Sequence, residues 1–410
     1  MLALLKSRLP DLTLGFIFFA LIAKRPEPYF SYIIGVFVLF LIYDIYRCYK
    51  SNDPYVLRQK EILIIIGGII AFYGALILDG ILLGNTKGIK IAFDYMYFSV
   101  PFFLVWWIRR KYTADTGIPW GIAIGIITSC IIGIWNIHIR YIPITDRLYG
   151  THFHPNVFAT VLTTTIPMTV YFTMKSKCLK AKVFLSLCTI VQFVALYFTF
   201  SRGAFLSLII GLPLAVFITA LITMEKVSAK VKKGMAGLLI LVLVFVGSAL
   251  FLRQESLNAG GKMGGERIQM RIASVEMWKD HKSLGVGLGN WFENYYGKYK
   301  PAGIRELDQK HPHNMSVYFL STTGLLGLIG YYAFIISVFS AVIIMGKRGD
   351  PLLCIAVLCI VLAFYIHGWL DQTIISKSLG RIYFAVLGYY MAAMADYAER
   401  IKNKIHPDKD

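Results

Sequence analysis

The chain has 410 residues, of which 57% are hydrophobic and only 16% are charged. This composition excludes an ordinary soluble protein of two or three domains and indicates a polytopic membrane protein. The formal net charge of +19 does not indicate nucleic-acid binding, because the basic residues are dispersed among the connections between apolar segments. We therefore expect membrane lipid, and no nucleic acid, around this chain.

Apolar runs follow one another along the whole chain. A hydrocarbon core of about 30 Å needs roughly 20 apolar residues in a helix. By that measure we expect about twelve membrane-spanning helices, approximately at residues 11–23, 29–46, 61–84, 91–108, 118–138, 157–174, 183–200, 203–223, 234–252, 314–345, 351–370 and 378–397. We predict an all-α polytopic membrane protein in which residues 1–410 form a single integral membrane domain.

One long polar stretch, Arg253 to His313, separates the predicted ninth and tenth spans. Lys and Arg gather in alternate connections, and short cytoplasmic loops are the ones that retain these residues. Both termini are therefore predicted to be cytoplasmic, and residues 253–313 to face the opposite side. In the inner membrane of a Gram-negative bacterium, that side is the periplasm.

The polar stretch contains two glycine-rich segments and one helical pattern. Residues 258–265 are too rich in glycine for a helix and predict a mobile connection. Apolar residues at Ile268, Ile272 and Val275 predict an amphipathic helix over residues 266–282 that lies at the membrane interface. The turn Leu284-Gly-Val-Gly-Leu-Gly-Asn290 lacks the Lys-Ser/Thr of a P-loop, so it does not indicate nucleotide binding.

The candidate chemical groups on the outer side are cations and histidines. The sequence has no Asp-x-Asp, no His-Glu-x-x-His and no Cys/His cluster, so we expect no metal ion and no cofactor. Arginine binds phosphate through two parallel hydrogen bonds, and an imidazole accepts a proton near neutral pH. Group transfer from a lipid diphosphate to a hydroxyl needs both. Proton-coupled transport, the main rival, usually places ionisable residues in mid-membrane, whereas Asp79 and Asp371 fall near predicted helix ends.

Several single residues can be interpreted either as catalytic or substrate-binding groups or as residues with a purely structural role. Arg202, in Phe200-Ser-Arg-Gly203, either presents its guanidinium inward at a backbone break or anchors a helix at the interface. His311 lines a site or is simply solvated, and His154 contacts a donor or caps a helix. Asp371 orients a catalytic partner or, as we favour, forms a local polar pair with His367 one turn earlier.

An ordered set of motifs resembles the O-antigen ligase family. Ser201-Arg202-Gly203 opens a predicted helix, Arg267 precedes Gly285-x-Gly287, and His313-Asn314 precedes Gly324-Leu-Leu-Gly327. The segment ending in His154-Pro-Asn156 is similar to a His-Pro-Asn segment of that family. The resemblance covers roughly residues 150–370 and departs from the family at Lys282, where many members carry Pro.

The resemblance implies a GT-C-like glycosyltransferase of lipopolysaccharide biosynthesis, inverting and metal-independent. Its donor would be undecaprenyl-diphosphate-linked O-antigen, and its acceptor a sugar hydroxyl of lipid A-core. The implied catalytic residues are His313, which would activate or orient the acceptor hydroxyl, and Arg202 and Arg267, which would grip the diphosphate. We expect Arg271, Asn314, His311, His154 and Asn156 to contact substrate, and Arg271 is the alternative to Arg267 as the essential loop arginine.

Other members of the shared domain use the same donor. An O-antigen polymerase and a protein O-oligosaccharyltransferase therefore remain alternatives for this chain. A transporter of lipid or glycan is the alternative that is not an enzyme, and charged residues facing a central cavity would favour it.

Overall fold

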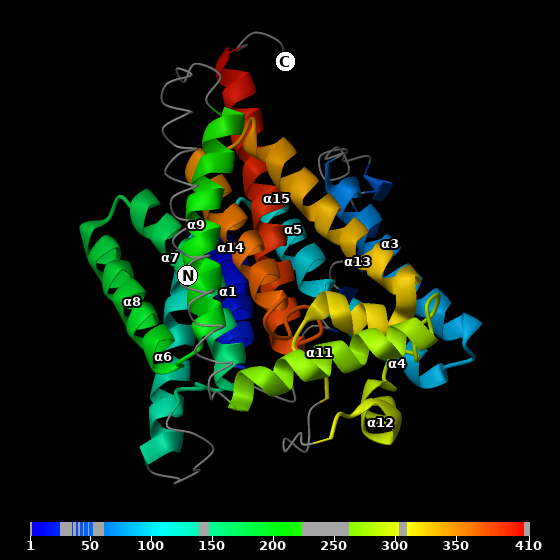
Figure 1. The fold of residues 1–410 in the computed structure, drawn as a ribbon. Helices are drawn as coiled ribbons and strands as arrows, with labels where there is room; N and C mark the ends of the chain where they lie inside the picture. Colours follow the sequence, from blue (N-terminus) through cyan, green and yellow to red (C-terminus); the bar gives the residue numbers. More distant parts are fainter. Residues whose placement is uncertain are drawn as a thin grey trace.

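Long apolar helices run side by side through the molecule, and one helix lies across their ends (Figure 1). The structure, a computed structural model, describes residues 2–24, 61–138, 147–223, 262–302 and 310–405, with isolated positions between 35 and 51. The described elements are α1 (Leu2–Ala23), α3 (Ile62–Leu82), α4 (Thr86–Tyr97), α5 (Val100–Tyr112), α6 (Gly117–His138), α7 (Pro155–Lys175), α8 (Leu179–Phe198), α9 (Arg202–Thr223), α11 (Lys262–Asp280), α12 (Trp291–Asn294), the π-helix η1 (Tyr295–Tyr299), α13 (Met315–Gly346), α14 (Pro351–Gly368) and α15 (Lys377–Ile405).

Within these described ranges, 8 segments are long and apolar enough to cross a membrane: Ile62–Leu82, Thr86–Tyr112, Gly117–Ile137, Pro155–Lys175, Leu179–Phe198, Arg202–Thr223, Met315–Gly346 and Pro351–Gly368. The predicted all-α polytopic architecture is confirmed. One segment, Thr86–Tyr112, consists of α4 and α5 in sequence, where a single span over 91–108 was predicted. The predicted spans 29–46 and 234–252 lie wholly or largely outside the described residues, and the total of about twelve stays a prediction.

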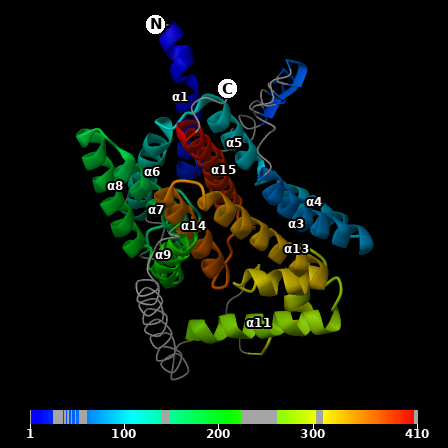
Figure 2. The same cartoon turned by 90° about the horizontal axis from the view of Figure 1, so that it is seen from above.

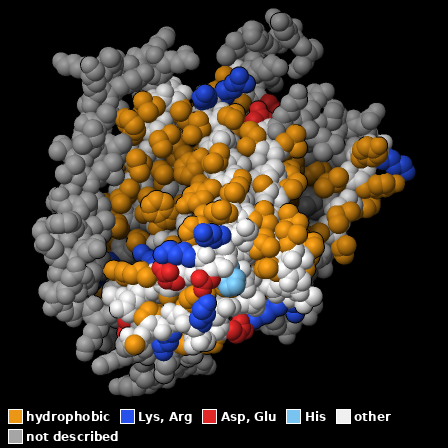
Figure 3. Space-filling view, turned by 45° about the vertical axis from the view of Figure 1, so that its right-hand side comes forward, with side chains coloured by type: hydrophobic (Ala, Val, Ile, Leu, Met, Phe, Trp, Pro, Cys, Tyr) orange, Lys and Arg blue, Asp and Glu red, His pale blue; other side chains and the backbone are white. Residues whose placement is uncertain are grey.

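A broad hydrophobic band covers the side of the molecule, with charged side chains gathered beyond its two edges (Figure 3). At the end away from α11, Arg109 and Arg110 of α5 are buried and donate hydrogen bonds to Asp396 of α15. Lys175, at the end of α7, pairs with Asp350 before α14 at 2.6 Å. Alternate connections thus share one end, as the charge pattern predicts, and the membrane side that this end faces stays a prediction.

Helix α13 is broken at Gly324, whose φ of 59° and ψ of −152° interrupt the helix. The break frees backbone N–H groups, and the residues just before the glycine-rich turn accept hydrogen bonds from them. The N–H groups of Leu325 and Leu326 donate to the carbonyls of Lys282 (3.2 Å) and Ser283 (3.4 Å). A Cβ on Gly324 would overlap the Ser283 carbonyl, so glycine is required for both the conformation and the close approach. The rest of α13, residues 325–346, matches the thickness of a bilayer at about 1.5 Å per residue.

Helix α11 lies across the ends of the long helices, as Figure 2 shows from a second direction. Its inner face buries Met270, Ala273 and Met277, while Ile268 and Ile272 are exposed. A helix over most of the predicted residues 266–282 is therefore confirmed, and it ends at Asp280. Its buried face is not the predicted stripe that contains Ile268 and Ile272, and its position at the membrane interface stays a prediction. The mobile connection predicted over 258–265 is wrong for residues 262–265, which form the first turn of α11; residues 258–261 lie outside the described part of the chain.

Candidate active site

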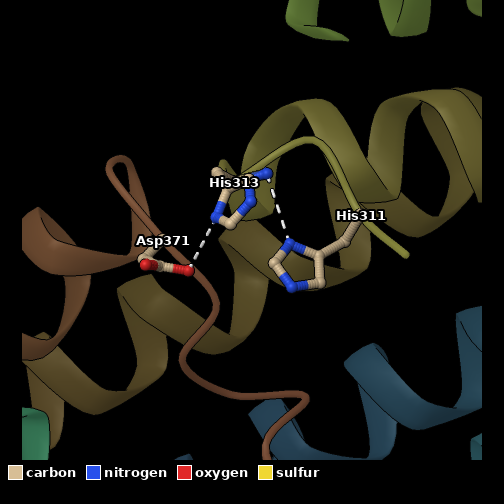
Figure 4. A group of neighbouring side chains, drawn as sticks. All are labelled: His311, His313 and Asp371. Carbon is tan, nitrogen blue, oxygen red and sulfur yellow. Dashed lines mark hydrogen bonds and ion pairs between the residues drawn. The ribbon is translucent and has the colours of Figure 1, made fainter. Parts of the chain in front are cut away.

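A buried histidine and aspartate form the centre of the candidate site. His313 lies just before α13, and Asp371 follows the end of α14. The Nδ1 atom of His313 is 3.0 Å from Oδ1 of Asp371, and their side chains are only 9% and 5% exposed (Figure 4). A carboxylate accepts, so this hydrogen bond assigns the proton to Nδ1 and leaves the lone pair of the neutral ring on Nε2. In that tautomer the imidazole can act as a base.

The backbone of His313 is held in an unusual conformation. Its φ is 50°, in the left-handed region that residues other than glycine seldom adopt. Two contacts secure it: the His313 N–H donates to Nδ1 of His311 at 3.3 Å, and Nη2 of Arg271 donates to the His313 carbonyl at 2.9 Å. Strain of this kind concentrates at functional sites, where surrounding contacts maintain it.

Asp371 accepts hydrogen bonds at both carboxylate oxygens. Nδ2 of Asn156, in the first turn of α7, donates to Oδ2, and the backbone N–H of Gln372 donates to Oδ1 at 2.8 Å. Burial would raise the pKa of Asp371, but the hydrogen bond from His313 and the positive charges around it outweigh burial and hold the pKa well below its usual range. The carboxylate is therefore ionised throughout the neutral range.

Two arginines of α11, the helix that lies across the ends of the bundle, are close to this pair. Arg267 and Arg271 are four residues apart, which puts them on the same face of the helix. Nη2 of Arg267 lies 3.9 Å from Oδ2 of Asp371, and Nη1 donates to the Leu370 carbonyl at 3.4 Å. The Arg267 side chain is still 39% exposed, so it can bind a further partner. The Nε atom of Arg271 is buried and has no hydrogen-bond partner among the described residues.

A third arginine, Arg147, belongs to the same cluster. Its Nη2 donates to Oδ1 of Asn156 at 2.8 Å. Burial and the charge of Arg267 lower the pKa of both Arg147 and Arg271, while Asp371 opposes that effect. The guanidinium groups therefore repel one another, and among the described residues Asp371 is the buried carboxylate that offsets their charge. Such a cluster favours binding of a further anion.

Arg202 begins α9 and has an exposed side chain. The backbone beside it is close to the site, because a Cβ on Gly203 would lie 3.3 Å from the His367 ring and from Cδ1 of Leu370. No hydrogen bond or ion pair joins Arg202 to another side chain in the described part of the chain. The structure thus places the start of α9 beside the turn that carries Asp371, without a direct contact between Arg202 and His313.

The other residues predicted to contact substrate have internal hydrogen bonds. Asn314 caps α13 by accepting from the N–H of Val317 at 3.0 Å, and its amide donates to the Trp369 carbonyl at 3.1 Å. His154 caps α7, where Nδ1 accepts from the N–H of Asn156 at 3.1 Å. Burial, followed by the neighbouring His313, lowers the pKa of His311 to about 3. His311 is therefore neutral at physiological pH and available as an acceptor.

Two residues of this site, Asp371 and Arg147, are not among the predicted catalytic and substrate-binding residues. Asp371 was interpreted as a local partner of His367, but the His367 ring bonds Thr160 Oγ1 at 2.7 Å, and Asp371 bonds His313 instead. The spacing of His367 and Asp371 on one helix end favoured the wrong pair. Arg147 has no predicted role, since nothing in its sequence neighbourhood indicates the contact with Asn156.

His311, His313 and Asp371 also form a group with the donor atoms of a metal site, all within 4.8 Å of one another. Two of these atoms already share the hydrogen bond between His313 and Asp371, and Nδ1 of His311 accepts the His313 N–H. A cation would have to replace both bonds. The existing hydrogen bonds account for the cluster, and the absence of a metal ion stays a prediction.

Comparison with known proteins bears on this site. The family model described as O-antigen ligase matches residues 187–332, which include Arg202, Arg267, Arg271 and His313. The match confirms the resemblance predicted from the motifs, and proteins of that family in general act on lipid-linked glycans. No curated protein sequence matches the chain. Arg147, Asn156 and Asp371 lie outside the matched residues.

Proposed function

We propose that this chain is an O-antigen ligase of lipopolysaccharide biosynthesis. It transfers polysaccharide from undecaprenyl diphosphate to a sugar hydroxyl of lipid A-core, at the periplasmic face of a bacterial inner membrane. The observation that carries the proposal is the buried His313–Asp371 pair beneath a cluster of arginines. A base beside a diphosphate-binding cluster is what transfer of a glycan from a lipid diphosphate requires.

The base in this reaction is His313. Nε2 takes the proton from the acceptor hydroxyl while the hydroxyl oxygen attacks the anomeric carbon of the donor sugar. The bond from that carbon to the diphosphate oxygen breaks, and the diphosphate leaves with the electron pair. A single displacement of this kind inverts the configuration at the anomeric carbon. Asp371 holds the Nδ1–H tautomer in place and stabilises the imidazolium that forms.

The arginines act on the leaving group. Arg267 is exposed enough to bind the diphosphate while it remains 3.9 Å from Asp371. Arg202 begins α9 and has an exposed side chain, and the next residue, Gly203, lies beside Leu370. Arg271 binds the His313 carbonyl through Nη2, so its first role is to support the base. We therefore assign the diphosphate to Arg267 and Arg202, and we expect the reaction to proceed in the presence of EDTA.

The lipids of a deletion strain test this function against its alternatives. We expect full-length polymer to accumulate on undecaprenyl diphosphate while lipid A-core carries no O-antigen, and we expect the wild-type gene, but not His313→Ala, to restore attachment. Core that carries a single repeat unit would instead identify a polymerase. Loss of glycan from proteins alone would identify a protein O-oligosaccharyltransferase, and donor that is retained on the cytoplasmic leaflet would identify a transporter.

A further inference from the structure

The mechanism above gives roles to Arg267, Arg202 and Arg271 but none to Arg147. Its Nε donates to the backbone carbonyl of Thr199 at 2.7 Å, and its Nη2 donates to Oδ1 of Asn156 at 2.8 Å. The next residue, Leu148, donates its N–H to the Phe198 carbonyl at 2.9 Å. The segment at Arg147 is thus joined to two consecutive carbonyls at the end of α8.

The contacts continue from Asn156 to the proposed base. Asn156 donates through Nδ2 to Asp371, and Asp371 accepts from Nδ1 of His313. Thr199, Asn156, Asp371 and His313 are all buried. An unbroken hydrogen-bonded chain therefore runs from the α8–α9 corner, through Arg147, to the imidazole.

The α8–α9 corner itself carries Arg202. Thr199 caps the end of α8, Phe200 has a φ of 48°, and α9 begins at Arg202. The first turn of α9 packs at Gly203 against His367 and Leu370. The same corner is therefore joined twice to the segment that carries Asp371, by packing of Gly203 on His367 and Leu370 and by hydrogen bonds through Arg147 and Asn156.

We infer that Arg147 is a positioning residue for the transfer reaction: it ties the corner that carries Arg202 to the Asn156 amide that holds Asp371. The inference rests on the proposed function. The guanidinium fork makes both bonds at once from two nitrogens in a fixed plane, Nε and Nη2, and a lysine does not reproduce this geometry, because all its donors are on one nitrogen. The distance between the donor-binding arginine and the base is fixed in this way, and misplacement by about 1 Å can reduce a rate on the order of 100-fold.

The competing role for Arg147 is direct binding of the donor diphosphate by its charge, and kinetics separates the two. We would measure initial rates of glycan transfer against donor concentration, at saturating lipid A-core, for purified wild type, Arg147→Lys, Arg147→Gln, Asn156→Ala and the double variant Arg147→Gln/Asn156→Ala. Lys279→Gln, which removes an exposed charge from the outward face of α11, is the control expected to match wild type.

For a positioning role, both Arg147→Lys and Arg147→Gln lower kcat by about 10- to 100-fold with the donor KM within about twofold of wild type. The double variant loses no more than the worse single variant, since both act through one chain of contacts. A raised donor KM with kcat retained, together with rescue by lysine, would overturn the inference in favour of direct binding. Losses that multiply in the double variant would overturn it as well.

Hydrogen–deuterium exchange separates this inference from the proposed function, because it needs no transfer activity. Arg147→Gln is expected to exchange faster than wild type in residues 198–203 and in residues 369–372, with residues 117–135 unchanged as an internal check on folding. Unchanged exchange in both site segments would refute the positioning role even in an active enzyme. Faster exchange in Arg147→Gln, together with a wild type that transfers no glycan, would instead support the contact and reject the proposed reaction.

Discussion

The pairing of His313 with Asp371 determines what each residue of the site can do. A histidine at this position follows from the His-Asn motif, and the motif alone predicts a base without its partner. Asp371 comes from a different helix end and is brought to His313 by the packing of α14 near α13. No local pattern predicts that approach, so the sequence left Asp371 with two interpretations, and only the fold pairs it with His313.

Asp371→Asn tests the pair directly. The amide keeps the size of the side chain but removes the charge that stabilises the imidazolium, and it can donate to Nδ1 and so reverse the tautomer. We expect kcat to fall by about 100- to 10,000-fold. Asp280→Asn is the matched control, because Asp280 is an exposed carboxylate of α11 that bonds Lys298 and Tyr299. Equal activity of Asp371→Asn and this control would reject the pair.

His311 predicts a pH dependence of stability. Its pKa is lowered to about 3 in the folded protein, against about 6.5 when unfolded. Between those values the unfolded chain binds the extra proton, so stability is present above about pH 6.5 and is lost as the pH falls toward 3. We expect His311→Gln to show a smaller drop in Tm between pH 7 and pH 5 than wild type. His152, whose pKa is lowered to about 4 by burial, contributes equally to both proteins and cancels.

A parallel drop in Tm for wild type and His311→Gln would contradict this account of His311. The same titration leaves Asp371 untouched, since its pKa lies well below its usual range and its stabilising charge is lost only at still lower pH. Activity should therefore not decline through Asp371 at mildly acidic pH.

At the scale of elements, the site depends on the docking of the glycine-rich turn into the break of α13. Gly285 has a φ of 66°, and a Cβ there would lie 2.6 Å from the Thr323 backbone nitrogen. The N–H of Val286 donates to the Ser321 carbonyl at 3.0 Å. This docking fixes the end of α11, and with it the position of Arg267 and Arg271 relative to His313.

Gly324→Ala should therefore damage the site from a distance. The added methyl group overlaps Ser283 and imposes a strained φ, which costs about 1–3 kcal/mol. We expect a lower Tm and a reduced transfer rate, measured on the same purified sample. Gly297→Ala is the control, since its Cβ would meet nothing within 4 Å and its φ is not positive. If both variants behaved alike, the glycine at the break would have no special role.

The elements themselves were largely predictable. Hydrophobic periodicity located α11 to within a few residues, and the apolar runs located the described spans. The break in α13 was not predicted. The backbone groups that it exposes are paired with residues 282–286, and no pattern within α13 itself indicates that distant partner. The long span predicted over 314–345 is divided at Gly324.

At the scale of the whole molecule, the two ends of the bundle differ in chemistry. The α11 end carries the arginines, His311 and His313, while the opposite end holds the Arg109–Arg110–Asp396 cluster. The alternation of basic connections predicts that the α11 end is periplasmic. In a background with Cys48 and Cys178 replaced by Ser, Lys279→Cys should react with a membrane-impermeant maleimide in cells whose inner membrane is intact. Arg348→Cys should react only after lysis.

The reverse labelling pattern would place the site on the cytoplasmic side and reject the proposed location. A cytoplasmic marker protein in the same sample must stay unlabelled, which shows that the inner membrane is intact. Labelling of both positions together with the marker would show that the reagent has crossed the membrane. The charge pattern predicts the orientation because Lys and Arg residues act on each connection while the chain is inserted. The assembly of the site could not be predicted in this way, because it depends on contacts between helices that are distant in sequence.

The central claim is that His313 removes the proton in transfer of glycan from a lipid diphosphate to lipid A-core. The most direct measurement incubates purified protein with undecaprenyl-diphosphate-linked O-antigen and lipid A-core, and follows both the glycosylated lipid A-core and the released undecaprenyl diphosphate. We predict equal amounts of the two products for wild type and, for a folded His313→Ala, a rate lower by about 100-fold or more. Transfer by His313→Ala at the wild-type rate would contradict the account.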